Sequence, residues 1–181
     1  MSNLLINNKK LVNEWNYEKN KDVDINKITL GSNKKVWWIC HNGHEWQASI
    51  YSRNDNSCPI CSNKQILKGY NDLETVNPLL AAEWNYEKND NLKPTMFTSG
   101  SHKKVWWKCL KGHEWYASIH HRNNGSGCPV CSNKQVLKGY NDLKTKNPVL
   151  AKEWNYDKNG NLKPDMVGAN SYKKVWWKCS Q

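Results

Sequence analysis

Apolar positions along the chain recur in two short patterns, each of which occurs three times. In the first, leucine and tryptophan stand four residues apart, as at Leu11 and Trp15, and this spacing places both side chains on one face of a helix. In the second, two lysines precede Val-Trp-Trp, as at residues 34–38, and the β-branched and aromatic residues favour a short strand. The sequence therefore predicts short helices that alternate with strands.

Further signals define where these elements begin and turn. Asn77-Pro78 and Asn147-Pro148 each supply an N-cap followed by proline at the first helical position. Helices of two or three turns are expected, and they are too short to be stable unless the Leu/Trp face packs on a neighbour. The segments Glu45–Ile50 and Glu114–Ile119 are predicted hairpin partners of the strands, and turns are predicted at 54–57 and 123–127.

Both patterns belong to one repeated unit. Val-Trp-Trp-x-Cys ends at Cys40, Cys109 and Cys179, and Glu-Trp-Asn-Tyr recurs at the same offsets of 69 and then 70 residues. The third copy stops before its second half, which leaves Cys179 without companions. We expect six segments: an N-terminal helical segment (1–30), a first module (31–70), a helical spacer (71–100), a second module (101–140), a second spacer (141–170) and the start of a third module (171–181).

Composition limits what can hold these units together. The chain has 11 Trp and 8 Tyr but a single Phe, so several small cores built around tryptophan are expected in place of one aliphatic core. Small units of this kind usually need a disulfide or a metal. The seven cysteines, the lack of a signal peptide pattern and the lack of an apolar stretch of membrane-spanning length favour a reducing, cytoplasmic compartment, where Cys-x2-Cys indicates metal binding.

Cysteine and histidine spacing then predicts the metal. Each module has Cys-x3-His, a gap of 13 or 14 residues, and Cys-x2-Cys, which is a set of soft and imidazole ligands that suits tetrahedral zinc better than iron. Four protein ligands leave no open position for water, so the zinc is expected to be structural, with two ions per chain. The predicted ligands are Cys40, His44, Cys58 and Cys61 in the first module and Cys109, His113, Cys128 and Cys131 in the second.

A family resemblance adds to this interpretation. The motifs Lys-Val-Trp-Trp-x-Cys, Gly-His-Glu-Trp, Cys-Pro-x-Cys-Ser-Asn-Lys and Gly-Tyr-Asn-Asp-Leu together resemble the treble-clef "probable zinc-ribbon" tandem repeat family of bacteria, phages and large DNA viruses. The resemblance implies a small α+β fold of tandem treble-clef or zinc-ribbon modules, each a β-hairpin with zinc knuckles, alternating with short helices. It also implies zinc ligation at the same eight residues. The first 20 residues lack the Gly-Tyr-Asn-Asp-Leu motif, and the third copy lacks its second knuckle.

The charge indicates an acidic partner. The formal net charge is +11, with +3 in residues 31–70, +6 in residues 101–140 and −3 in the intervening segment 71–100. Positive charge on two metal modules rich in aromatics favours a nucleic acid, DNA more than RNA, with no membrane role. The expected function is a non-enzymatic nucleic-acid-binding module, accessory to a nuclease or to a mobile-element or phage system. The alternative is a protein-interaction module that docks on a host enzyme or nucleoprotein complex.

Candidate contacts follow from residue type and position. Trp37 and Trp106 could stack on bases, although an interpretation in which every strand tryptophan is core is favoured over one in which a single member of each pair is free. The matched arginines suit phosphate or guanine contact, and a solvated or internally paired arginine is the alternative. The cations expected to contribute are Lys34, Lys35, Lys103 and Lys104 on the strands, Arg53 and Arg122 after the hairpins, and Lys64, Lys68, Lys134 and Lys138 after the second knuckles, where a treble clef places a helix.

The remaining histidines argue against catalysis. His41, His102, His120 and His121 are not duplicated between the modules. A nuclease of the kind that shares this metal scaffold would need a repeated histidine with a carboxylate partner, so no catalytic residue is predicted. Glu45 and Glu114 are interpreted as residues that support the strands rather than as general bases.

Overall fold

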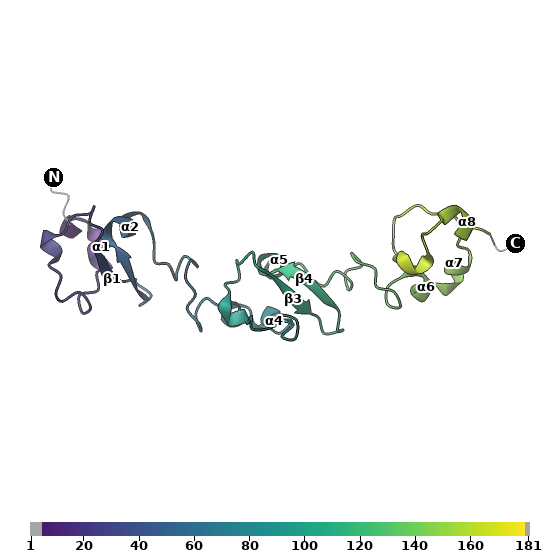
Figure 1. Cartoon of the computed structure of the whole chain (residues 1–181), viewed down its shortest axis with the longest axis horizontal. Helices are drawn as coiled ribbons and strands as arrows, with labels where there is room; N and C mark the ends of the chain where they lie inside the picture. The colour runs from purple at the N-terminus through teal and green to yellow at the C-terminus, as the bar shows by residue number, and fades with distance from the viewer. Residues whose placement is uncertain (1–4, 180–181) are drawn as a thin grey trace. The chain divides into compact units, whose positions relative to one another are not determined.

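The computed structural model describes residues 5–179 (Figure 1). The contacts of the chain divide it into two compact units. The first unit holds the chain up to Pro78 together with Pro94–Ser99. The second holds Leu79–Lys93 together with the chain from Gly100 onwards. Each unit contains one two-stranded antiparallel sheet. The small α+β fold predicted from the sequence is confirmed.

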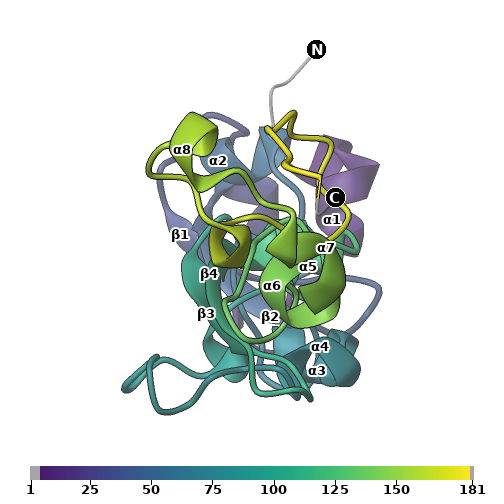
Figure 2. The same cartoon turned by 90° about the vertical axis from the view of Figure 1, so that its right-hand side faces the viewer.

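The two hairpins have the same register, and β3 and β4 lie side by side in both views (Figures 1 and 2). Trp38 faces Trp46 across the first hairpin, and Trp107 faces Trp115 across the second. Both hairpins lie where the sequence predicted them. The strands are β1 (Lys35–Ile39), β2 (Glu45–Ser49), β3 (Lys104–Lys108) and β4 (Glu114–Ser118).

The helices are shorter than the two or three turns that we expected. They are α1 (Lys9–Asn13), α2 (Ile50–Asp55), α3 (Leu73–Val76), α4 (Pro78–Ala81), α5 (Ile119–Asn123), α6 (Leu143–Lys146), α7 (Pro148–Lys152) and α8 (Tyr156–Asn159), with 3-10 turns η1 (Leu5–Asn7), η2 (Ile25–Lys27), η3 (Pro94–Met96) and η4 (Pro164–Met166).

Backbone pairing explains why α1, α4 and α7 end early. After α1 the chain runs along the free edge of β1, where Trp15 forms an isolated antiparallel bridge with Trp38. The N–H of Ile39 donates to the carbonyl of Glu14 at 2.8 Å. A longer helix would use these backbone groups internally, so pairing with the strand ends it. The same bridge joins Trp84 to Trp107 and Trp154 to Trp177.

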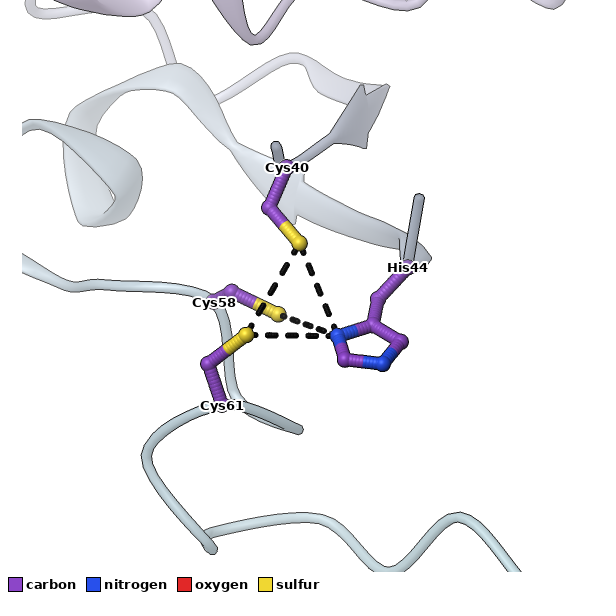
Figure 3. Close-up of side chains that lie close together, drawn as sticks. All are labelled: Cys40, His44, Cys58 and Cys61. Carbon is purple, nitrogen blue, oxygen red and sulfur yellow. Dashed lines mark hydrogen bonds between the residues drawn. The ribbon is translucent and has the colours of Figure 1, made fainter. Parts of the chain in front are cut away.

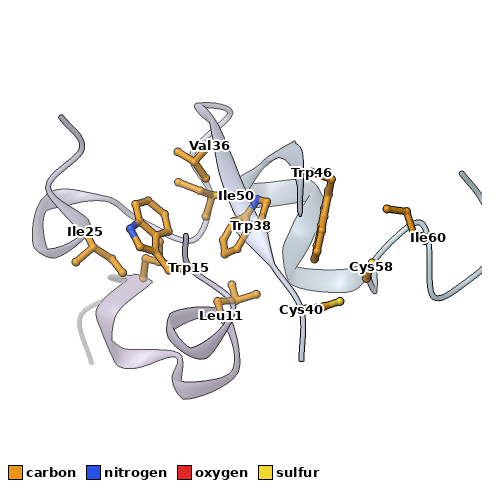
Figure 4. Close-up of a cluster of buried hydrophobic side chains, with 11 residues drawn as sticks. Leu11, Trp15, Ile25, Val36, Trp38, Cys40, Trp46, Ile50, Cys58 and Ile60 are labelled. Atoms are coloured by element: carbon orange, nitrogen blue, oxygen red, sulfur yellow. The ribbon is translucent and has the colours of Figure 1, made fainter. Parts of the chain in front are cut away.

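Tryptophan builds the core, as the composition indicated. In the first unit Trp15 meets Trp38 edge to face at 5.6 Å between ring centroids, and Leu11 packs beside them (Figure 4). The equivalent pair in the second unit, Trp84 and Trp107, lies at 5.4 Å. Edge-to-face pairs of this kind stabilise a core beyond the area that they bury. The shared Leu/Trp face expected from the sequence is therefore what joins each short helix to the hairpin that follows it.

Two local predictions need correction. The turn predicted at 54–57 begins inside α2, because the Ser49 side chain accepts the N–H of Ser52 and so caps a helix there. The helices expected around Lys64 and Lys68 and around Lys134 and Lys138 are absent, and the chain forms turns at both places. The Asn71 side chain satisfies the backbone of the first of these loops, since its amide donates to the carbonyls of Ile60 and Gln65. The loop therefore needs no helix to pair its polar groups.

The third copy forms only part of the unit. Residues 173–178 make the bridge between Trp177 and Trp154 but pair with no second strand among residues 5–179. The predicted opening strand is therefore an extended segment. Its small core consists of Leu143, Ala151, Trp154 and Val167. The six-segment division of the chain stays a prediction.

Candidate metal centres

The first predicted ligand set is brought together by the hairpin and the loop after α2 (Figure 3). Cys40 directly follows β1 and His44 directly precedes β2, while Cys58 and Cys61 lie on the loop. Gly43 has a φ of +78°, a conformation that glycine adopts without strain, and its N–H donates to the Cys40 carbonyl at 2.8 Å. This tight turn returns His44 towards Cys40.

The distances between the ligand atoms fit a tetrahedral ion. His44 Nδ1 lies 3.5 Å from Cys40 Sγ, 3.8 Å from Cys58 Sγ and 3.2 Å from Cys61 Sγ, and the Cys40 and Cys61 sulfurs are 3.8 Å apart. With Zn–S of about 2.3 Å and Zn–N of about 2.0 Å, a tetrahedron separates two sulfurs by about 3.8 Å and sulfur from nitrogen by about 3.5 Å. The four side chains therefore stand at the corners that zinc requires.

The second set repeats this geometry. His113 Nδ1 lies 3.5 Å from Cys109 Sγ, 3.6 Å from Cys128 Sγ and 3.3 Å from Cys131 Sγ. In both sets all ligand atoms lie within 4.8 Å of one another. Three thiolates and one imidazole with no open position are typical of structural zinc. The prediction of two structural zinc ions is confirmed.

The ligand thiols differ in the direction in which their pKa values are shifted. Burial raises the pKa of Cys58, and burial together with the Cys128 and Cys109 thiols raises the pKa of Cys131 to about 11. Thiolates crowded in this way repel one another, and a divalent ion offsets that repulsion. At Cys40 burial acts in the same direction, but hydrogen bonds from the backbone N–H groups of His44 and Asn42 outweigh it, so its pKa lies below the ordinary value.

Two tyrosines that the sequence did not single out lie against the metal-binding histidines. The Tyr70 ring stands edge-on to His44 at 4.2 Å, and Tyr140 stands in the same way to His113 at 4.3 Å. Asn42 Nδ2 donates to both the Tyr70 hydroxyl, at 3.3 Å, and Cys61 Sγ, at 3.4 Å. The Gly-Tyr-Asn-Asp-Leu motif therefore covers the site that precedes it. Its repetition was visible in the sequence, but no ligand chemistry marked its tyrosine.

A second group that the sequence did not reveal positions the strands. Asn20 accepts the backbone N–H of Trp37 at 2.9 Å and donates to its carbonyl at 2.8 Å, and Asn89 does the same for Trp106. Each asparagine side chain thus forms hydrogen bonds with the backbone N–H and carbonyl groups of the strand that point away from the hairpin partner. Both are among the buried polar residues. The repeated asparagine was visible, but its partner lies 17 residues away and no local pattern indicates it.

The two arginines predicted to contact nucleic acid serve the fold. Arg53 is 1% exposed, pairs with Glu14, and donates to the carbonyl of Asn56. Arg122 pairs with Glu83 and lies over the rings of Trp107 and Trp115 at 5.2 and 5.0 Å. Both guanidiniums are thus held by partners within the fold, and Arg53 also lines a cavity with Trp37 and Lys64. The alternative of an internally paired arginine therefore holds at both positions.

The strand tryptophans divide into buried and half-buried members. Trp38 and Trp107 have no exposed surface, whereas Trp37 and Trp106 are half-buried, so the favoured all-core interpretation is corrected. Lys19 lies over the Trp37 ring at 4.4 Å and Lys88 over the Trp106 ring at 4.5 Å. The rings of these two half-buried tryptophans, the outer tryptophans Trp37 and Trp106, are therefore each covered by a lysine of the same unit.

All the lysines predicted to contact nucleic acid are exposed. Some of them line a cavity together with a tryptophan. A cavity of about 560 Å³ is lined by Trp37 and Lys64, and one of about 330 Å³ is lined by Trp106, Lys103 and Lys104. The other lysines line neither of these cavities, and Lys138 pairs with Asp165 at 2.7 Å. The residues concerned are Lys34, Lys35, Lys68, Lys134 and Lys138.

Two further groups have structural partners. Hydrogen bonds from Lys19 and Asn16 hold the pKa of Glu45 below its ordinary value, and those from Lys88 and Asn85 do the same for Glu114, which supports their interpretation as fold residues. The His102 and His120 rings lie 4.8 Å apart at the start of α5, next to His121. The first module has no such cluster, since Tyr51 and Ser52 stand in place of the last two histidines.

Comparison with known families supports the metal assignment. A family model described as a probable treble clef zinc finger domain matches residues 11–64, 80–134 and 150–181. The first two matches each contain one complete ligand set. A comparison with curated proteins finds no match. Within residues 5–179 no helix has the length and apolar character that crossing a membrane requires.

Proposed function

The chain belongs to the family of probable treble clef zinc finger domains, and from that premise we propose that it is a non-enzymatic protein that binds nucleic acid. The observation that carries the proposal is the arrangement of lysines around the outer tryptophans. Lys34 and Lys35 precede Trp37, and Lys103 and Lys104 precede Trp106. No ion pair found among residues 5–179 involves any of these four lysines. Their charge is available to phosphates.

The zinc ions contribute by holding this surface in place. The first and second ligand sets join β1 to β2 and β3 to β4 at the end where Cys40 and Cys109 follow the strands. The lysines lie at the opposite end of the same short strands. Fixing each hairpin therefore fixes the lysine pair at its own end, and phosphate contacts by such pairs give binding that weakens as salt rises.

The finer choices within this function remain predictions. DNA is proposed over RNA on the basic, aromatic-rich character of the modules, and an accessory role in a nuclease, mobile-element or phage system is proposed on the resemblance alone. A reducing compartment is proposed because seven cysteines stay free of disulfides. Parallel measurements with DNA and RNA of the same sequence would decide the first choice.

The decisive variant is Lys103→Gln with Lys104→Gln. Loss of two phosphate contacts should weaken binding uniformly across sequences and reduce the salt dependence by about two counterions. The matched control is Lys9→Gln with Lys10→Gln, which removes the same charge from exposed positions on α1. Fluorescence anisotropy at several salt concentrations measures both, with zinc content checked in each variant.

The control decides between local contact and general charge. Equal losses in the two double variants would mean that net charge alone attracts the ligand, and binding that ignores salt in the unsubstituted chain would contradict the proposal outright.

A protein partner is the second candidate, and one observation favours it. Leu79 and Val149 stand at matched positions after Pro78 and Pro148, and they are 85% and 71% exposed. Apolar side chains displayed in this way at matched positions suit a protein interface. If the chain binds no nucleic acid at low salt, while Leu79→Ser with Val149→Ser abolishes a stoichiometric complex with a purified partner, this candidate replaces the first.

A further inference from the structure

The two hairpins present different outer faces. The outer face comprises the alternate strand positions that point away from the tryptophan core. In the first hairpin it carries Lys35, Trp37 and Ile39 on β1 and Glu45 and Gln47 on β2. In the second hairpin it carries Lys104, Trp106, Lys108, Glu114 and Tyr116. Lysine therefore replaces isoleucine and tyrosine replaces glutamine, whereas the inner faces keep valine and tryptophan.

The tyrosine creates an aromatic pair that the first hairpin lacks. Tyr116 lies directly opposite Trp106, and the ring centroids are 5.4 Å apart with the planes inclined by 49°. Lys88 covers the Trp106 ring, so Tyr116, which is 54% exposed, provides the accessible aromatic surface. No cation is found over Tyr116 within residues 5–179. In the first hairpin Lys19 covers Trp37, and Gln47 offers no ring.

Lysines share a cavity with this aromatic pair. Trp106 and Tyr116 share the lining of the cavity of about 330 Å³ with Lys103 and Lys104, whose ammonium groups are free of ion pairs in the described part of the chain. Asp90 also lines the cavity, and Lys88 is paired with Glu114 at 2.6 Å. Two unpaired cations beside an exposed ring are the elements of a site for one stacked base and its phosphates.

We propose that the second hairpin is a stacking site for an unpaired base of a single-stranded nucleic acid, with Tyr116 as the stacking residue and Lys103 and Lys104 as phosphate contacts. The inference rests on the proposed nucleic-acid function and deepens it. A base inside a duplex presents only its edges, so it cannot stack on Tyr116. Both modules supply lysines, whereas only the second hairpin has a ring without a covering cation on its outer face.

Paired substitutions at one register position test the site. In Tyr116→Gln the second hairpin acquires the residue that the first hairpin already accommodates, so the fold and zinc content should be kept. Affinity for an oligothymidylate of about 12 nucleotides should fall about 5- to 100-fold, which is the loss expected for one stacked base. Affinity for the corresponding duplex should not change. The control is Tyr86→Gln, since Tyr86 is also 54% exposed but lies outside the outer face.

The reciprocal substitution provides an independent measurement. Gln47→Tyr places a ring opposite Trp37 and should raise single-strand affinity while leaving duplex affinity unchanged. If Tyr116→Gln lost zinc, Gln47→Tyr would decide alone. Oligouridylate of the same length distinguishes RNA from DNA as the source of the base. A gain in the affinity of Gln47→Tyr for either oligonucleotide supports the site.

The outcomes separate this inference from the function on which it rests. Single-strand binding that Tyr116→Gln leaves unchanged, or that Tyr86→Gln weakens equally, overturns the stacking site and leaves the nucleic-acid function in place. A Gln47→Tyr variant with no gain also overturns it. Failure of the unsubstituted, zinc-loaded chain to bind any of the three nucleic acids at low salt overturns the proposed function itself.

Discussion

At the residue scale, asparagine side chains complete the backbone hydrogen bonding at the strand edge that the hairpin partner does not use. Asn89 forms two hydrogen bonds with the backbone of Trp106, at 2.8 Å each, on the edge of β3 that β4 does not use. The carbonyl of Trp106 also accepts the N–H of Asn85 at 3.1 Å, whereas its N–H depends on the buried Asn89 side chain for a partner. The outer tryptophan is therefore held in position from its backbone, independently of what its ring contacts.

Asn89→Ala tests this role. The variant leaves the N–H of Trp106 unpaired and leaves its carbonyl with only the N–H of Asn85, so the free energy of unfolding should fall by about 2 kcal/mol. Asn91→Ala removes an exposed asparagine from the same segment and should change it by less than about 0.5 kcal/mol. Denaturant unfolding with zinc present measures both. Equal effects in the two variants would show that the hydrogen bonds contribute nothing specific.

The second feature at the residue scale is the contribution of a buried arginine to stability. Arg53→Met removes a guanidinium that is 1% exposed and leaves Glu14 without its partner, which should lower the free energy of unfolding by about 3 kcal/mol. Lys19→Met breaks the pair with Glu45, whose side chains are 41% and 36% exposed, and should cost less than about 1 kcal/mol. Nucleic-acid affinity of the folded Arg53→Met chain should be unchanged. A selective loss of affinity would restore Arg53 to the interface.

At the scale of elements, a polar side chain caps the start of α1, α2, α3, α5, α6, α7 and α8. Asp72 caps α3 by accepting the N–H of Thr75 at 3.1 Å and the Thr75 hydroxyl at 2.8 Å, and it also accepts the N–H of Gly69 at 2.6 Å. Burial acts to raise the pKa of Asp72, but these hydrogen bonds outweigh it and hold the pKa below its ordinary value. Asp142 caps α6 in the same way.

The lowered pKa gives this cap a defined pH dependence. Because the folded state favours the ionised carboxylate, the stabilisation is present above the pKa of the unfolded chain, at about 4, and is lost as the pH falls through the lower folded-state pKa. Asp72→Ala should cost about 1–2 kcal/mol at neutral pH, and exposed Asp22→Ala should cost little. Urea unfolding at neutral pH checks the magnitude. If Asp72→Ala left the free energy of unfolding unchanged, α3 would be stable without its cap.

The elements also show how far local sequence signals reach. The hairpins and the ligand sets could be predicted because alternation and Cys/His spacing are local patterns. The length of α1 could not, because the residue after it pairs with β1, more than 20 positions away. The burial of Arg53 also depends on Glu14, which belongs to a different element. Properties that depend on residues far apart in the sequence have no local sequence signal.

At the scale of the whole molecule, two zinc ions hold cores that are small and aromatic. The first core contains 11 buried residues, among them Cys40 and Cys58, so metal ligation and hydrophobic packing share the same side chains. Removal of zinc with a chelator should therefore unfold both hairpins together with their preceding short helices. Tryptophan fluorescence should shift to that of exposed indole. A chelated chain that keeps its native spectrum would show that packing alone is sufficient.

Zinc stoichiometry of the intact chain tests the central claim most directly, because everything displayed by the hairpins depends on the two metal centres. Native mass spectrometry should find two zinc ions per chain, one in Cys58→Ser or Cys128→Ser, and none in the double variant, while Cys179→Ser keeps both. One or three ions in the unsubstituted chain, or two ions that persist in the double variant, would contradict the account.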